Sequence, residues 1–273
     1  MWPHFSNALS CIFGTVNNQL YQINMKLSGA CKIVLTLFII GSGSGKCGAQ
    51  AILNDSLFLQ TSLHSAIASY HQSMGEQSGL YNGIEYPGYP FPFKEGHPFF
   101  YDTKPNLGSI SYNQVLYPGV HLQLNEVAGV VVLNEHSRKI QLINERIDSF
   151  SILDNYFIHI RKDTTNSTAP PAGFYQLLYQ GNVVLLKREV KLINENIRSA
   201  DEGITRSIDS RRLYYLKKGN TYFPVNNQQA LFNFFGDRKK EVQAVARQRK
   251  LKFRKEKERT ILELTRYYDQ LIN

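Results

Sequence analysis

The sequence contains few cysteines and no long hydrophobic run. All three cysteines, Cys11, Cys31 and Cys47, precede Gln50, so the rest of the chain can form neither a disulfide framework nor a cysteine-based metal site. Charged residues make up only 19% of the 273 residues, and hydrophobic residues make up 42%. This composition excludes a disordered chain and a multi-span membrane protein, and the length allows one large or two modest domains.

The excess of positive charge is confined to the two ends of the chain. Lys and Arg number 31 against 22 Asp and Glu, yet residues 50–236 contain equal numbers of basic and acidic residues. Residues 1–49 have no acid, and residues 237–273 have 12 basic and 6 acidic residues. This distribution excludes a wholly basic nucleic-acid-binding domain, so no nucleic-acid partner is expected.

Residues 25–49 have the three parts of a secretory signal peptide. Lys26 and Lys32 form a charged region, an apolar core follows at 33–40, and a tract of small residues ends at Ala49. The eight-residue core is too short to span a bilayer, which needs about 20 apolar residues. We therefore expect cleavage after Ala49 and export to the periplasm or the outer cell surface.

Other features near the N-terminus have ordinary explanations. Residues 1–24 lack charge and periodicity, so we interpret them as an upstream extension. Lys46 stands directly before Cys47, at a position where attachment of a lipid requires a small residue, so no lipid anchor is expected at Cys47. The run Gly41–Lys46 resembles a phosphate-binding loop, but it lacks the first glycine and the hydroxyl after the lysine, so no nucleotide is expected.

Residues 50–105 predict an N-terminal helix followed by an extended, proline-rich segment. Leu63, Ile67, Tyr70 and Met74 recur at helical spacing. Residues 86–101 contain four prolines and seven aromatic residues, which excludes a regular helix or a central strand.

We call residues 86–101 the strap. The favoured interpretation is an extended segment that crosses a sheet and packs its rings into the core. The alternative is an aromatic platform for a sugar or a peptide, formed by Tyr86, Tyr89, Phe91 and Phe93.

Residues 106–225 predict an antiparallel β domain. Apolar residues alternate with polar ones, as at Val120, Leu122 and Leu124, and turn residues separate the runs. The spacing leaves no room for crossover helices. The expected fold class is therefore α+β: an antiparallel β-meander, open, rolled or partly closed, with an N-terminal helix and a C-terminal pair or trio of helices.

Residues 226–273 predict a basic helical segment. Asn226 or Asn227 caps a short helix that ends before Gly236. A second helix is expected from Asp237 to about Arg249. A last helix runs from about residue 255 to 271, and its apolar face is formed by Ile261, Leu264, Tyr268 and Leu271.

The basic run in this segment has two interpretations. A solvated helix face is the common explanation of such a run. The functional alternative is contact with another envelope protein or with an anionic membrane or glycan surface. The candidate contact residues are Arg247, Arg249, Lys250, Lys252, Arg254, Lys255, Lys257 and Arg259.

The chain after Gln50 contains none of the sequence motifs of common hydrolases, so no catalytic residue, metal or cofactor is expected. The expected function is a non-enzymatic binding or structural module of the cell envelope. The alternative is a periplasmic hydrolase whose site is assembled from distant histidines and acids.

Six short motifs carry a resemblance to a known group of proteins. They are LYNG at 80–83, HPFF at 97–100, YYLKKGNTYFPV at 214–225, GDRKKE at 236–241, LKFR at 251–254 and YYD at 267–269. Over about residues 80–273 the chain resembles uncharacterised exported proteins of Bacteroidota-type bacteria. The resemblance implies a Gram-negative envelope, and it implies no activity.

The predicted signal peptide can be tested directly. Mass spectrometry of the protein purified from the cell envelope should find an N-terminus at Gln50 or Ala51, because the small residues Cys47 and Ala49 precede the expected cut. A cytoplasmic protein that retains residues 1–49 would contradict this prediction.

Overall fold

The computed structural model describes residues 59, 61–62, 65–66, 69–70, 79–135, 137–197 and 203–272. The chain divides into two units, residues 1–59 and residues 60–273. The predicted signal peptide and upstream extension lie outside the described residues. Most of the predicted N-terminal helix does too, and the structure gives that helix no support. In the described part, no helix combines the length and apolarity needed to cross a membrane.

The described strands form one antiparallel sheet, as predicted. Eleven strands pair in the order β1-β5-β4-β3-β2-β6-β7-β8-β9-β10-β11, and every neighbouring pair is antiparallel. Because β1 and β11 are separate edges, the sheet is open and not closed. The strands are β1 (Ile84–Glu85), β2 (Asn106–Tyr112), β3 (Val115–Asn125), β4 (Val130–Glu135), β5 (Arg138–Gln141), β6 (Ile147–Ile152), β7 (Asn155–Ile160), β8 (Gly173–Gln180), β9 (Val183–Ile197), β10 (Ile204–Lys218) and β11 (Thr221–Pro224).

The topology differs from a single meander at one place. Strands β2 to β5 form one meander and β6 to β11 form another, but β6 pairs with β2 and not with β5. The free edge of β5 is instead taken by β1. The chain leaves β5 through a 3-10 turn, η3 (Asn144–Arg146), before β6 begins. Strand pairing between distant segments of this kind leaves no local pattern in the sequence.

The first hydrophobic core is formed by buried side chains of β2 to β8 and of adjacent turns. It includes Leu80 from a second 3-10 turn, η2 (Gly79–Tyr81), and the stacked rings of Phe150 and Phe157, whose centroids are 4.8 Å apart. Its buried members are Leu80, Ile110, Tyr112, Val120, Leu122, Leu124, Val131, Leu133, Ile140, Leu142, Ile147, Phe150, Ile152, Phe157 and Phe174.

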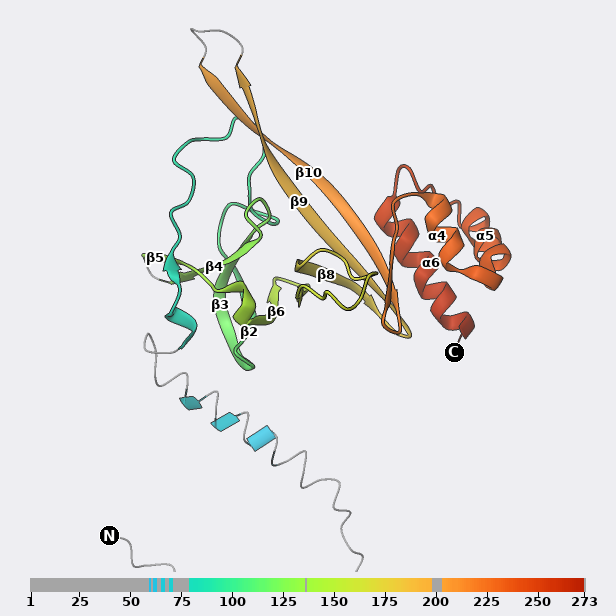
Figure 1. Cartoon of the computed structure of the whole chain (residues 1–273), viewed down its shortest axis with the longest axis horizontal. Coiled ribbons are helices and arrows are strands. Elements are labelled where there is room, and N and C mark those ends of the chain that lie inside the picture. The colour runs from blue at the N-terminus through green and yellow to red at the C-terminus, as the bar shows by residue number, and fades with distance from the viewer. Residues whose placement is uncertain are drawn as a thin grey trace, which may run out of the picture. The chain divides into compact units, whose positions relative to one another are not determined.

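The longest strands are β9 and β10, which Figure 1 shows as one extended, twisted hairpin. Their register runs without a break from Val183 opposite Lys218 to Ile197 opposite Ile204. The apolar pattern of a strand covers only residues 183–192 and 213–217 of this hairpin in the sequence. The outer part escaped prediction because its polar side chains on both faces remove the apolar alternation that marks a strand.

Three helices follow β11, as predicted: α4 (Gln228–Phe234), α5 (Lys239–Gln248) and α6 (Lys257–Ile272). Asn227 caps α4, because its side chain accepts a hydrogen bond of 2.8 Å from the amide of Ala230. Gly236 has a φ of +52°, and its missing side chain lets the backbone turn there into η4 (Gly236–Arg238).

The helices form a second hydrophobic core with the first residues of β9 and the last residues of β10, which we call the inner ends of these strands (Figure 1). Val183 and Leu185 of β9 are fully buried there together with Ile261 and Leu264 of α6. Buried Asp269 of α6 adds a polar tie, since its carboxylate accepts hydrogen bonds from the hydroxyl of Tyr179 (2.8 Å) and the amide of Val183 (3.0 Å). The other members of this core are Tyr214, Leu216, Val225, Leu231, Phe232, Phe235, Val242, Ala246, Phe253 and Tyr268.

Truncation of the buried face of α6 should destabilise the protein. Leu264→Ala is expected to lower the free energy of unfolding by about 2–5 kcal/mol, because it removes a fully buried side chain and leaves a cavity. Gln270→Ala, at an exposed position of the same helix, should change it by less than about 0.5 kcal/mol. Urea denaturation measures both values, and equal effects would mean that α6 is not docked.

Candidate binding surfaces

The strap is hydrogen-bonded to three strands that lie far apart in the sequence. The amide of Tyr86 donates to the carbonyl of Lys139 in β5, and the amide of Lys94 donates to the carbonyl of Arg206 in β10, both at 2.8 Å. The amide of Phe100 then donates to Leu124 of β3, also at 2.8 Å. The strap is therefore an extended segment that crosses between both parts of the sheet.

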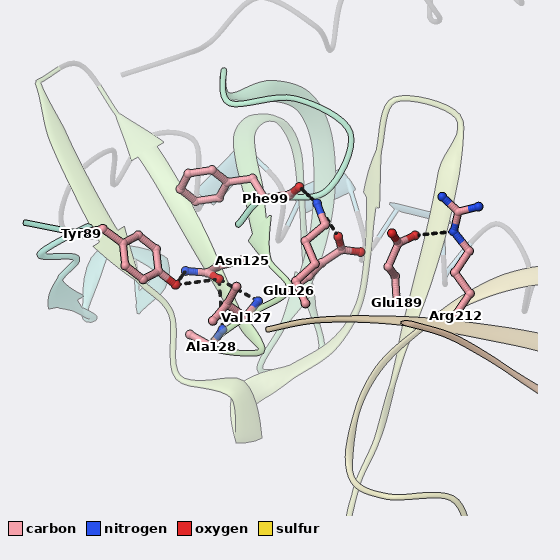
Figure 2. A network of polar contacts seen from close by, with 9 residues as sticks. Tyr89, Phe99, Asn125, Glu126, Val127, Ala128, Glu189 and Arg212 are labelled. Carbon is pink, nitrogen blue, oxygen red and sulfur yellow. Dashed lines mark hydrogen bonds and ion pairs between the residues drawn. The ribbon is translucent and has the colours of Figure 1, made fainter. Parts of the chain in front are cut away.

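Buried Asn125, at the end of β3, holds the first half of the strap. Its amide nitrogen donates to the hydroxyls of Tyr86 (2.7 Å) and Tyr89 (3.1 Å). Its side-chain oxygen accepts hydrogen bonds of 3.0 Å from the amides of Val127 and Ala128 (Figure 2). One side chain thus closes the β3–β4 turn and ties two strap tyrosines to it.

The four residues of the proposed aromatic platform lie in different surroundings. Tyr86 is buried, whereas Tyr89, Phe91 and Phe93 are half-buried and meet with ring centroids 5.2–5.8 Å apart at tilted or edge-to-face angles. The guanidinium of Arg206 covers one face of Phe91 at 4.0 Å. The rings therefore pack mainly on one another, and a sugar or peptide site on them stays a prediction.

A buried ion pair holds the second half of the strap. The ammonium of Lys191 in β9 lies 3.1 Å from the carboxylate of Glu126, and their side chains are only 11% and 4% exposed. The same ammonium donates to the carbonyl of Phe99 in the strap (Figure 2). The amide of Glu126 donates to the carbonyl of Pro98 at 2.8 Å. A backbone and a side-chain hydrogen bond therefore hold neighbouring residues of the strap.

Burial changes the ionisation of the groups around this pair. Loss of solvation raises the pKa of Glu126 from 4.5 to about 7, against the opposing effect of Lys191. Burial also lowers the pKa of His97, and the positive charge of Lys191 lowers it further. The Nδ1 atom of His97 is buried and has no hydrogen-bond partner among the described residues.

Two more charged side chains of β9 point to the same face as Lys191. Lys187 pairs with Glu258 of α6 at 2.9 Å, and Glu189 pairs with Arg212 of β10 at 3.1 Å (the latter pair in Figure 2). These residues are not among those predicted from the sequence to form a site. The alternation that places Val183 and Leu185 inward also places residues 187, 189 and 191 inward. Charged residues at positions that the pattern predicts to face inward were the signal that could have identified this site.

The structure divides the eight basic candidates into two groups. Three of them are engaged within the protein. Arg249 lies 3.6 Å from Glu263, and Arg259 bridges Glu263 (2.8 Å) and Glu256 (3.1 Å). Lys257 is half-buried over the rings of Tyr214 and Phe253, at 5.2 and 5.7 Å, and burial lowers its pKa.

The remaining five basic candidates are exposed and unpaired. They lie at the C-terminal end of α5 and in the segment between α5 and α6, residues 249–256, which we call the connector. Their side chains make no hydrogen bond or ion pair with any residue that the structure describes. They are Arg247, Lys250, Lys252, Arg254 and Lys255.

Three of the unpaired cations line a groove of about 470 Å³ between α4, α5 and the connector. Phe232, Ala246 and Leu251 supply its apolar surface, and two glutamine side chains complete the lining. The full lining is Gln228, Phe232, Gln243, Ala246, Arg247, Lys250, Leu251 and Lys252. The sequence reveals the cations but not the glutamines and the apolar surface of the groove, because helices pack through contacts that a basic run does not show.

Lys250 has an unusual backbone conformation at the end of α5. Its φ is +53°, and two hydrogen bonds of 3.0 Å join Leu251 to Ala246 and Lys250 to Arg247. These bonds form the Schellman motif, in which glycine usually occupies the position of Lys250. A residue with a Cβ costs roughly 1–2 kcal/mol in this conformation.

A second hollow on the described surface contains a histidine and an acid. His159 and Asp163 line a second hollow of about 450 Å³, but His159 contacts the carbonyl of Ile147 at 3.1 Å, and Asp163 accepts bonds from Thr165 and Asn166. Within the described ranges, no group of three or more His, Cys, Asp or Glu is placed to hold a metal ion.

Comparison with known proteins found no protein-family model, no curated protein and no solved structure that matches this chain. The expected likeness to exported proteins of Bacteroidota-type bacteria stays a prediction. The function proposed below therefore rests on the chain's own side chains and their geometry.

The buried carboxyl of Glu126 should make stability depend on pH. A folded-state pKa raised to about 7 means that its contribution is fully present below about pH 4.5 and is lost as the pH rises through 7. Glu126→Gln removes this titration. The difference in unfolding free energy between wild type and variant should therefore fall by up to roughly 3 kcal/mol between pH 4.5 and 8.

Urea denaturation at several pH values measures this difference. The control is Glu195→Gln in β9, which changes an acid whose side chain is 53% exposed and should therefore give a smaller pH-dependent difference. A difference that is constant with pH for Glu126→Gln would show that the carboxyl is not desolvated.

Proposed function

We propose that this chain is an exported, non-enzymatic binding module of the cell envelope that attaches to anionic lipid through its C-terminal helical segment. The observation that carries the proposal is the group of five exposed, unpaired cations in residues 247–255. An unpaired ammonium or guanidinium can bind a lipid phosphate directly, whereas an ion-paired one must first give up its carboxylate.

The distribution of charge supports a local attachment site. The sheet region is formally neutral, and the charged side chains on the inner face of β9 are compensated by Glu126, Arg212 and Glu258. The five unpaired cations lack such compensation, although Glu256, Glu258 and Glu263 lie close by in the sequence. Export is the part of the proposal that rests on residues 25–49, and it places the chain next to anionic envelope lipid.

Vesicle binding tests the proposal. Arg254→Gln combined with Lys255→Gln should weaken binding to phosphatidylglycerol vesicles about 30-fold at low salt, because each cation near such a surface contributes about 1 kcal/mol. The matched control, Lys104→Gln combined with Lys139→Gln, removes two exposed cations elsewhere and should weaken binding less than about threefold.

Sedimentation of the protein with vesicles gives these affinities, and raising the salt concentration should weaken them. Equal losses in both double variants would mean that only net charge matters. Absence of binding by the wild-type protein would refute the proposed function.

A further inference from the structure

We propose that the groove between α4, α5 and the connector holds the phosphate headgroup of a single lipid molecule. This inference rests on the proposed function and names the ligand at its centre. The phosphate would lie against the cations of the rim, and the neighbouring hydrocarbon would lie on the apolar side chains of the groove. Phe232 and Leu251 are the largest of these apolar side chains.

The charge of the rim fits a phosphate monoester. Arg247, Lys250 and Lys252 place three positive charges around one groove, with no carboxylate in its lining. The C-terminal end of α5 carries about half a negative charge from the helix dipole, which offsets only a small part of the positive charge of the rim. A phosphate monoester carries about −1.5 to −2 at pH 7, so it balances this rim better than a monoanionic carboxylate does. The guanidinium of Arg247 can also bind two phosphate oxygens at once.

The size and the surface of the groove call for more than a bare anion. A volume of about 470 Å³ is typical of pockets that hold small organic ligands, and phosphate alone would leave much of it to water. Phe232 is buried against the second core on one side and lines the groove on the other. A ligand with methylene groups next to its phosphate would cover this apolar surface.

The backbone of Lys250 is a second, independent observation. A lysine occupies the left-handed position of a Schellman motif, where glycine would remove the steric strain. The strained residue is also one of the three cations that line the groove. Strain retained at a ligand-facing residue is typical of a functional site. The structure thus favours a binding role for this side chain over a stabilising one.

Isothermal titration calorimetry of the purified protein tests the inference with three probes. Dihexanoyl phosphatidic acid supplies both the phosphate monoester and short chains. Dihexanoyl phosphatidylcholine supplies the same chains without net charge, and inorganic phosphate supplies the anion alone. Phosphatidic acid should bind at least tenfold more tightly than either of the other probes, because only it can use the cations and the apolar surface together.

Four variants locate the site. Lys250→Gly should lower the affinity for phosphatidic acid at least tenfold, while its thermal midpoint stays equal or rises by about 2–4 °C as the strain is relieved. Lys250→Arg should retain affinity within threefold. Leu251→Ala should weaken phosphatidic acid binding several-fold and leave the affinity for phosphate unchanged. Lys104→Gln with Lys139→Gln, two exposed lysines outside the groove, should leave phosphatidic acid binding within threefold.

The outcomes separate this inference from the proposed function. If vesicles bind but monomeric phosphatidic acid does not, the groove is not a lipid site and the surface attachment stands. If phosphate or phosphatidylcholine binds as tightly as phosphatidic acid, the groove does not recognise an anionic amphiphile. If Lys250→Gly keeps full affinity, the ligand does not lie at Lys250. Each of these three results overturns the inference.

Discussion

The unbroken pairing of β9 with β10 is the constraint on which the rest of the described structure depends. At its inner end Val183 and Leu185 enter the core beneath the three C-terminal helices. Farther along, Lys191 reaches Glu126 and the strap, and near the outer end the strap pairs with β10. A strand of fifteen residues allows one hairpin to contact both the β-rich part of the chain and its basic helical segment.

Buried charge is the cost of this arrangement. Removing Glu126 and Lys191 from water is unfavourable, and their mutual attraction and the carbonyl of Phe99 offset part of this penalty. An apolar pair of similar volume could be as stable. The ion pair adds specificity that an apolar pair would lack, because the ammonium binds one carbonyl of the strap and one carboxylate of the β3–β4 turn. It thereby fixes where the strap crosses the sheet.

Local pattern predicted the elements of this chain well and their long-range partners poorly. Alternation at residues 120–124 and helical spacing at residues 261–271 report which face of an element is apolar, so the strands and the last helix followed from the sequence. The pairing of β6 with β2, and the outer half of β9, depend on contacts across many residues. At the candidate binding surface the cations were visible in the sequence, but their division into paired and unpaired depends on the positions of Glu256 and Glu263 in the fold.

We propose that the chain binds anionic lipid at α4, α5 and the connector, and that the strap has a structural role. Hydrogen–deuterium exchange of the protein with and without phosphatidylglycerol vesicles tests it most directly. The account predicts slower exchange in peptides that cover residues 228–255, and unchanged exchange in the strap and in β9. Slower exchange in the strap, with none at residues 228–255, would contradict the account and would favour the aromatic residues as the binding surface.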